Sequence, residues 1–211
     1  MPGHVRALAC LGALLLAAPT ARAQVAAVPS DSGFRAALLR MRAEDQDGRE
    51  RVAQAVASGD TLFIKALMAR DTALTRRLQA LVALHGWPTR ATVGEDGVEA
   101  AWLVLQHSPD LAWQQEMLPR IWEASRTGDV RPAEAAMLED RIRTNSGVPQ
   151  RYGNSFQVVD GELRPHPIED IDGLEARRRE VGLPPMAEYV KVLAEVYQLP
   201  VAWPPRPAPQ R

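Results

Sequence analysis

The chain has 211 residues, of which 46% are hydrophobic and 24% charged, and its 25 Lys and Arg nearly balance 26 Asp and Glu. Without a basic excess the chain has little to neutralise phosphates, which argues against nucleic-acid binding. One cysteine excludes a disulfide framework within the chain. The length favours one domain with a sizeable core.

The first 23 residues have the pattern of a cleavable secretory signal peptide. Arg6 gives a weakly basic start, residues 7–18 form an apolar stretch, and Ala21-Arg22-Ala23 has the small-x-small pattern that signal peptidase recognises. The stretch is shorter than the roughly 20 residues that a membrane-spanning helix needs. We therefore expect cleavage near Ala23, export to the periplasm or the exterior, and no stable membrane anchor afterwards. The mature chain would also lose Cys10, its only thiol.

The remaining chain divides into three predicted parts. Residues 24–33 are small and polar and are expected to form a flexible leader. Residues 34–199 are predicted to form a single helical domain. Residues 200–211 are rich in proline and are expected to be an extended, disordered tail.

Apolar residues recur with a helical period through most of the predicted domain. The pattern predicts a helix over residues 34–58, and a second helical region over residues 62–84 that Asp71-Thr72 divides as an internal N-cap. Ser108-Pro109 is predicted to be the N-cap and first residue of a later helix. The other predicted helices cover residues 95–107, 110–125, 132–145, 172–181 and 185–198.

The period changes near residues 155–165. Asp160-Gly161 lies there between two short β-prone runs, which is typical of a two-residue hairpin turn. The predicted fold class is therefore mostly α, a helical bundle of about six to eight helices with one small β-hairpin.

Several polar residues stand next to predicted helix ends. Asp45 and Arg49 are four residues apart, so one helix would bring them to the same face as a pair. His85 and Gln106-His107 lie in the last turns of their helices, where a histidine can simply bond the free carbonyl groups. Loops at helix ends are also where polar groups gather around a cleft, so both roles stay open for His107.

A second group of polar residues follows in the C-terminal half. Asp140 and Arg141 are adjacent on a helix and point about 100° apart, so one of them is expected to face inward and to need a partner. Gln150 and Tyr152 in the following loop offer directed hydrogen-bond donors and acceptors. A structural network in which Arg49, Arg141, Asp45 and Asp140 satisfy one another is the main competitor to a catalytic role.

Six short blocks stand out along the chain: His85-Gly86-Trp87-Pro88, Val93-Gly94 with Gly97, Ala101-Trp102-Leu103 with Gln106-His107, Leu138 with Asp140-Arg141, Gln150 with Tyr152-Gly153, and Arg177-Arg178 with Gly182-Leu183. In combination, these blocks resemble a family of small bacterial proteins known only as a domain of unknown function. The resemblance runs from about Asp45 to Tyr189 and implies a helical fold with a shared polar centre, but no activity or cofactor. Asn154-Ser155 stand where the family pattern has Thr-Gln, so the resemblance assigns these two positions no role.

We expect these polar residues to line one cleft that binds a small polar ligand. If the protein is an enzyme, the groups suit hydrolysis or group transfer, with His107 as general base, Asp140 as its orienter, and Arg141 or Gln150 stabilising negative charge. The expected ligand-binding residues are Asp45, Arg49, His85, Gln106, Gln150 and Tyr152.

Two alternatives to an enzyme site stay open. The cluster can be an inert network in a non-enzymatic binding or interaction module, whose protein partner the sequence does not identify. A metal site built from His85, His107 and an Asp is a weaker alternative, because the ligand spacing matches no known pattern. We therefore predict neither a metal nor another cofactor.

Overall fold

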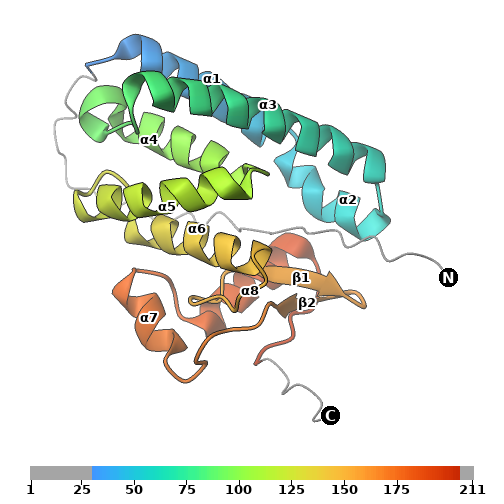
Figure 1. Cartoon of the computed structure of the whole chain (residues 1–211). Coiled ribbons are helices and arrows are strands. Elements are labelled where there is room, and N and C mark those ends of the chain that lie inside the picture. The colour runs from blue at the N-terminus through green and yellow to red at the C-terminus, as the bar shows by residue number, and fades with distance from the viewer. Residues whose placement is uncertain (1–29, 205–211) are drawn as a thin grey trace. The chain divides into compact units, whose positions relative to one another are not determined.

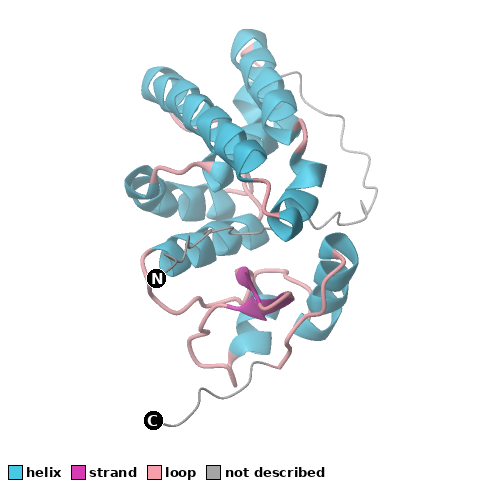
Figure 2. Ribbon diagram, turned by 90° about the vertical axis from the view of Figure 1, so that its right-hand side faces the viewer, coloured by secondary structure: helices cyan, strands magenta, loops and turns pink. Residues whose placement is uncertain are grey.

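The computed structural model describes residues 30–204, which form a mostly helical fold with one antiparallel β-hairpin, as predicted. Figure 2 shows how helices dominate these residues. The predicted signal peptide, most of the leader and residues 205–211 lie outside the described residues. Within residues 30–204 no helix is both long and apolar enough to cross a membrane.

The residues that were predicted to form a single domain divide into two compact units, which meet in sequence at Leu138 and Glu139. In the N-terminal unit, α1 packs against both α3 and α4, and α2 packs against α3 (Figure 1). Its elements are α1 (Ser32–Gln46), the 3-10 helix η1 (Arg49–Arg51), α2 (Val52–Ser58), α3 (Thr61–His85), α4 (Arg90–His107), α5 (Leu111–Arg126) and the first half of α6 (Pro132–Asn145).

Helix α1 has a cap at its start and a buried stripe along its length. The Asp31 carboxylate accepts a hydrogen bond from the Phe34 amide at 2.8 Å, which satisfies one of the free N–H groups of the first turn. The buried stripe runs through Phe34, Leu38 and Met41 and continues to Asp45. The helix ends at Gln46, well before the predicted end at Ser58, because Gly48 adopts a left-handed conformation with φ 73°.

Helix α3 runs unbroken for 25 residues, so the predicted internal N-cap at Asp71-Thr72 is wrong. The Thr72 hydroxyl donates to the Met68 carbonyl four residues earlier, which is compatible with a continuing helix. The Asp71 carboxylate takes no part in capping and bonds Arg49 instead. The helix begins after Asp60, whose carboxylate accepts from the Phe63 amide.

Helices α4 and α5 are joined by a short turn at residues 108–110. Within α4 the backbone breaks at Gly94, with φ 76° and ψ 170°, just before the start predicted at residue 95. The N-cap of α5 is Asp110, whose carboxylate accepts from the Trp113 amide, and not Ser108 as predicted. The Ser108 hydroxyl instead accepts from the Asp110 amide within the turn.

The C-terminal unit contains the rest of α6, the hairpin and two short helices. Strands β1 (Phe156–Val159) and β2 (Glu162–Pro165) pair across the predicted turn, where Asp160 and Gly161 both have positive φ. Helices α7 (Leu174–Glu180) and α8 (Met186–Tyr197) follow.

The first residues of the predicted tail pair with the hairpin. The Leu163 amide donates to the Pro200 carbonyl, and the Ala202 amide donates to the Leu163 carbonyl, both at 2.8 Å. Leu163 itself is fully buried. Residues 200–202 are therefore ordered against the outer edge of β2.

Candidate functional site

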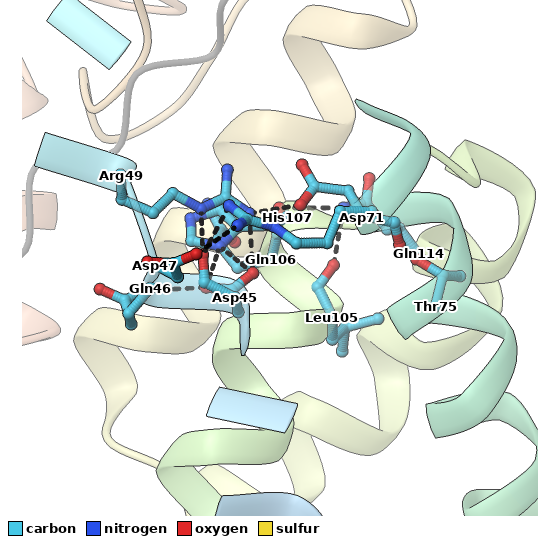
Figure 3. Close-up of polar contacts among 11 residues, drawn as sticks. Asp45, Gln46, Asp47, Arg49, Asp71, Thr75, Leu105, Gln106, His107 and Gln114 are labelled. Carbon is cyan, nitrogen blue, oxygen red and sulfur yellow. Dashed lines mark hydrogen bonds and ion pairs between the residues drawn. The ribbon is translucent and has the colours of Figure 1, made fainter. Parts of the chain in front are cut away.

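Four charged or titratable side chains meet in the N-terminal unit, and we call them the Asp45 cluster: Asp45, Arg49, Asp71 and His107 (Figure 3). The His107 Nδ1 atom lies 2.9 Å from each Asp45 carboxylate oxygen. The Arg49 Nη2 atom donates to Asp45 Oδ1 at 2.7 Å and to Asp71 Oδ1 at 2.6 Å. The cluster thus joins α1, η1, α3 and α4 through side-chain contacts.

The helices place these side chains by their periodicity. Asp45 extends the apolar stripe of α1, and Asp71 occupies the same kind of position on α3, four residues after Leu67 and three before Leu74. Both acids therefore face the interior of the unit. Helix α4 ends at His107, which brings the imidazole to the edge of the same region.

Arg49 reaches the cluster by a turn and not along a helix face. The chain turns at Gly48 after α1 has ended, and the Arg49 Nε atom then donates to the Asp45 carbonyl at 2.9 Å. This bond satisfies a carbonyl of the last turn of α1. The predicted pairing of Asp45 with Arg49 is therefore present, although a turn produces it instead of a continuous helix.

The Asp45 cluster combines deep burial with partial exposure. The Asp45 side chain is only 1% exposed, while the His107 and Arg49 side chains are each 18% exposed. Burial opposes ionisation of Asp45, but the hydrogen bond and charge of His107 and the charge of Arg49 outweigh it, so the pKa of Asp45 is lowered. An ionised Asp45 accepts hydrogen bonds only, so the bonded Nδ1 atom of His107 carries a proton.

The second acid of the cluster has the opposite electrostatic character. Burial raises the pKa of Asp71, and the neighbouring Asp45 charge acts in the same direction, against the lowering effects of Arg49 and His107. Two carboxylates that share one guanidinium thus have pKa values pushed apart. Such a division is common in sites that carry out acid–base chemistry and also occurs in structural ion-pair networks.

Two buried glutamines lie beside the cluster at the end of α4. The Gln114 amide donates to the carbonyls of Leu105 at 2.9 Å and Gln106 at 3.3 Å. Both carbonyls lie in the last turn of α4, where the Leu105 carbonyl also accepts from the Ser108 amide. Gln106, which was predicted to bind a ligand, is buried next to His107 in the chain, and its carbonyl bonds Gln114 (Figure 3).

A second polar group lies in the C-terminal unit, where residues 150–155 wrap around the Asp140 carboxylate. We call this the Asp140 loop. Asp140 is fully buried and accepts from the backbone amides of Arg151 at 2.7 Å, Tyr152 at 3.0 Å and Asn154 at 2.9 Å. The Asn154 side-chain amide adds a fourth bond at 3.0 Å. Burial raises the pKa of Asp140, and the amide bonds oppose that effect.

Gln150 and Arg178 complete the internal bonding of this loop. The Gln150 side chain donates to the Ser155 and His166 carbonyls and accepts from the Ser155 amide, so both ends of its amide group are engaged. The fully buried Arg178 donates to the Tyr152 and Pro184 carbonyls and to the Asn154 side chain. Asn154 therefore links a buried anion to a buried cation.

Nearly all of the described residues match one protein family. A model for a family of unknown function, DUF6624, matches residues 32–202. The chain belongs to this family. The resemblance predicted from the polar blocks is thereby confirmed, and the DUF6624 match includes both polar groups. No curated protein and no solved structure matches the chain.

The predicted site residues of this DUF6624 chain fall into separate groups. Asp45, Arg49 and His107 come together, whereas Asp140, Gln150 and the Tyr152 backbone belong to the other unit. The carboxylate bonded to Nδ1 of His107 is Asp45, and the Asp140 carboxylate is engaged by amides, so the orienting position predicted for Asp140 is filled by Asp45. Arg141 follows Asp140 on α6 and is half-buried.

His85 lies away from the Asp45 cluster in the DUF6624 chain. It ends α3, stacks on the Phe34 ring at 4.6 Å between centroids, and lies 3.6 Å from Asp31. Fourteen residues of helix at 1.5 Å per residue separate it from Asp71 by roughly 21 Å. A metal site combining His85 and His107 therefore does not form, and residues 30–204 contain no group of three or more His, Cys, Asp or Glu side chains placed to hold a metal.

Three residues of the two polar groups were not predicted from the sequence: Asp71, Asn154 and Arg178. Asp71 had a signal, because it falls in register with the apolar stripe of α3. Arg178 belongs to one of the family blocks, but its place in a run of three arginines is typical of a solvated surface.

Proposed function

We propose that the protein is an enzyme that carries out hydrolysis or group transfer on a small polar substrate at the Asp45 cluster. The observation that supports this proposal is the bond between a buried, ionised carboxylate and Nδ1 of a partly exposed histidine. In hydrolytic enzymes such a pair fixes the tautomer of the imidazole and stabilises the imidazolium that forms during proton transfer.

In the proposed mechanism His107 is the general base and Asp45 orients it. Because Nδ1 is bonded to Asp45, proton transfer would use Nε2. Nε2 removes a proton from water, the resulting hydroxide attacks the electrophilic centre of the substrate, and the imidazolium returns the proton to the leaving group. Arg49 holds Asp45 ionised, since it donates to the same carboxylate.

A non-enzymatic alternative has one observation in its favour. The charged groups of the Asp45 cluster pair with one another, which is also what an inert structural network requires. In that case the protein would be a binding or interaction module. The two functions differ in what the loss of His107 does, because an inert network contributes to stability and a general base contributes to turnover.

The test compares His107→Ala with His85→Ala, since both histidines end a helix and only His107 belongs to the cluster. Hydrolysis of p-nitrophenyl acetate, p-nitrophenyl phosphate and alanine p-nitroanilide would be followed, with circular dichroism as a check of folding. We expect the loss of the general base to reduce turnover by about 10²–10⁴-fold, and His85→Ala to stay within about twofold of the wild type.

Two results would contradict the enzyme proposal. One is a folded His107→Ala protein that keeps the wild-type rate on a substrate that the wild type turns over. The other is no turnover of any probe together with a lower melting temperature for His107→Ala, which would favour the structural network.

We also propose that the protein is exported and that the signal peptide is removed after Ala23. The apolar stretch and the small residues before Gln24 support this. The mass of the protein recovered from the periplasm or the medium should correspond to a chain beginning at Gln24. Recovery of a chain that still begins at Met1, in the cytoplasmic fraction, would exclude export.

A further inference from the structure

We propose that Asp71 is a positioning residue that sets the proton affinity of His107 through Arg49. This inference rests on the proposed function for its catalytic meaning, because the proton affinity of His107 matters only if His107 is the general base. The sequence patterns gave Asp71 a capping role, and no site residue was predicted on α3 before His85.

The geometry of one nitrogen atom supports the proposal. Arg49 Nη2 lies 2.6 Å from Asp71 Oδ1 and 2.7 Å from Asp45 Oδ1, so a single N–H-bearing atom is shared between the two carboxylates. The second oxygen of Asp45 lies 2.9 Å from His107 Nδ1. Asp71, Arg49, Asp45 and His107 therefore form a continuous chain of charged contacts.

The Asp71 carboxylate bonds Arg49 and makes no capping bond within α3. The helix continues through this position. The bond between Asp71 and Thr75 within α3 uses the Asp71 backbone carbonyl, which accepts from the Thr75 hydroxyl at 2.8 Å, and not the Asp71 carboxylate. A buried ionised acid on an apolar stripe is costly unless it is paired. Arg49 supplies that pairing, at the cost of sharing its charge with Asp45.

The sharing of Arg49 has a defined electrostatic consequence. While Asp71 is ionised, Arg49 neutralises Asp45 only in part, and Asp45 keeps more negative charge to stabilise an imidazolium at His107. If Asp71 loses its charge, Arg49 pairs with Asp45 alone and the imidazolium is less favoured. Asp71 is also the more easily protonated acid, because burial raises its pKa while that of Asp45 is lowered.

The other polar groups around Asp45 do not provide this control. Gln46 donates to Asp45 Oδ2 at 2.7 Å and is uncharged. Arg70 approaches the Asp45 carbonyl at 3.4 Å and faces the largely exposed Asp47 carboxylate at 3.6 Å. Asp71 is therefore the buried charge whose loss most directly changes the pairing of Arg49.

The experiment follows the imidazole proton signals of the full chain by NMR as pH is varied, in the wild type, Asp71→Asn, Arg49→Gln and the double variant. We expect Asp71→Asn to lower the titration midpoint of His107 by about half a unit to one unit. Arg49→Gln should raise it, because a positive charge is lost beside two acids. The signal of His85, at the far end of α3, is the internal control and should not move.

The double variant separates an effect through Arg49 from direct repulsion. If Arg49 carries the effect, the shift that Asp71→Asn causes should be at least halved in the Arg49→Gln background. An equal shift in both backgrounds would overturn the proposal, since the Asp71 charge would then act directly. A shift below about 0.2 unit for Asp71→Asn alone would overturn it even if Arg49→Gln did not fold.

This readout does not depend on turnover. If His107→Ala keeps full activity while Asp71→Asn still moves the His107 midpoint, the proposed function fails and the electrostatic coupling remains. If His107→Ala abolishes turnover and Asp71→Asn leaves the midpoint unchanged, the function holds and the role of Asp71 is wrong.

Discussion

The Asp45 cluster and the Asp140 loop both contain a buried aspartate, but the two acids have different partners. Asp45 is held by side chains from other elements, which are themselves charged or titratable and partly exposed. Asp140 is held mainly by backbone amides of one loop, and two of these three partners, Tyr152 and Asn154, are also buried. Only the first arrangement leaves a group of adjustable protonation near the surface.

This difference separates an acid that shapes the local fold from the acid for which we propose a functional role. Backbone amides cannot change their protonation state, so their bonds to the Asp140 carboxylate fix the path of residues 150–155. The imidazole on Asp45 can exchange a proton, and the guanidinium can donate hydrogen bonds. Burial alone therefore does not distinguish the two aspartates, whereas the chemical nature of their partners does.

The largest effect is expected for Asp140→Ala. It would leave three backbone N–H groups, two of them buried, and the Asn154 side chain without their acceptor, and should lower the free energy of unfolding by about 3–5 kcal/mol. Urea unfolding followed by circular dichroism would measure this. Asp172→Ala, at an exposed position, is the control and should change stability by less than about 0.5 kcal/mol. Equal effects of the two substitutions would remove the distinction between the regions.

A smaller effect is expected at the glycines that shape each region. Gly153 and Gly48 both have φ 73°, so alanine introduces a similar backbone strain of about 1–2 kcal/mol at either position. At Gly153 a new Cβ atom would also lie 3.2 Å from the Met186 sulfur, whereas at Gly48 its nearest neighbour is the Phe63 ring at 3.7 Å. Thermal unfolding should therefore show a larger loss for Gly153→Ala than for Gly48→Ala. The reverse order would show that the turn before Arg49 is the more constrained one.

The pH dependence of stability should be weaker in Asp45→Asn than in the wild type. Because the pKa of Asp45 is lowered in the folded protein, the unfolded chain binds the extra proton as the solution is acidified. The stabilisation is therefore complete above the ordinary Asp pKa of about 3.9 and is lost as the pH falls through the lowered folded value. Urea unfolding between about pH 5 and pH 2 would measure the slope, and an unchanged slope in the variant would contradict the assignment.

The smallest change in stability is expected for Asp71→Asn. Asparagine keeps an oxygen that can accept from Arg49 and removes the cost of burying a charge, which raises the pKa of Asp71 in the wild type. Stability at neutral pH should change by less than about 0.5 kcal/mol or increase, as is common for residues of functional sites. A loss as large as that of Asp140→Ala would place Asp71 among the residues that determine the fold.

Most of the helical fold could be predicted from periodicity, and the hairpin from Asp160-Gly161. The errors came from local signals with two meanings. Asp71-Thr72 is typical of an N-cap, yet tertiary pairing with Arg49 holds Asp71 inside a continuous helix. Conversely, Gly48 ends α1 within a helical pattern that runs on to Ser58.

The candidate site could be predicted only where its hydrogen bonds and ion pairs join two side chains. The spacing of Asp45 and Arg49 indicated their pairing, and His107 stood out as a polar residue at a helix end. The partners of Asp140 could not be found in this way, because backbone amides belong to every residue and carry no sequence signature. The pairing of His107 with Asp45, 62 residues apart, depends on how α1 and α4 pack.

The segment at residues 200–202 also affects how the hairpin behaves in solution. An isolated strand edge offers free N–H and C=O groups to other chains and is a common start of aggregation. In this protein Pro200 and Ala202 occupy the outward-facing N–H and C=O groups of Leu163, so that part of β2 is shielded. The family match extends to residue 202 and so includes this segment. The start of the proline-rich stretch therefore covers part of the free edge of β2. Truncation before Pro200 would leave that edge open to pairing with other chains and favour aggregation.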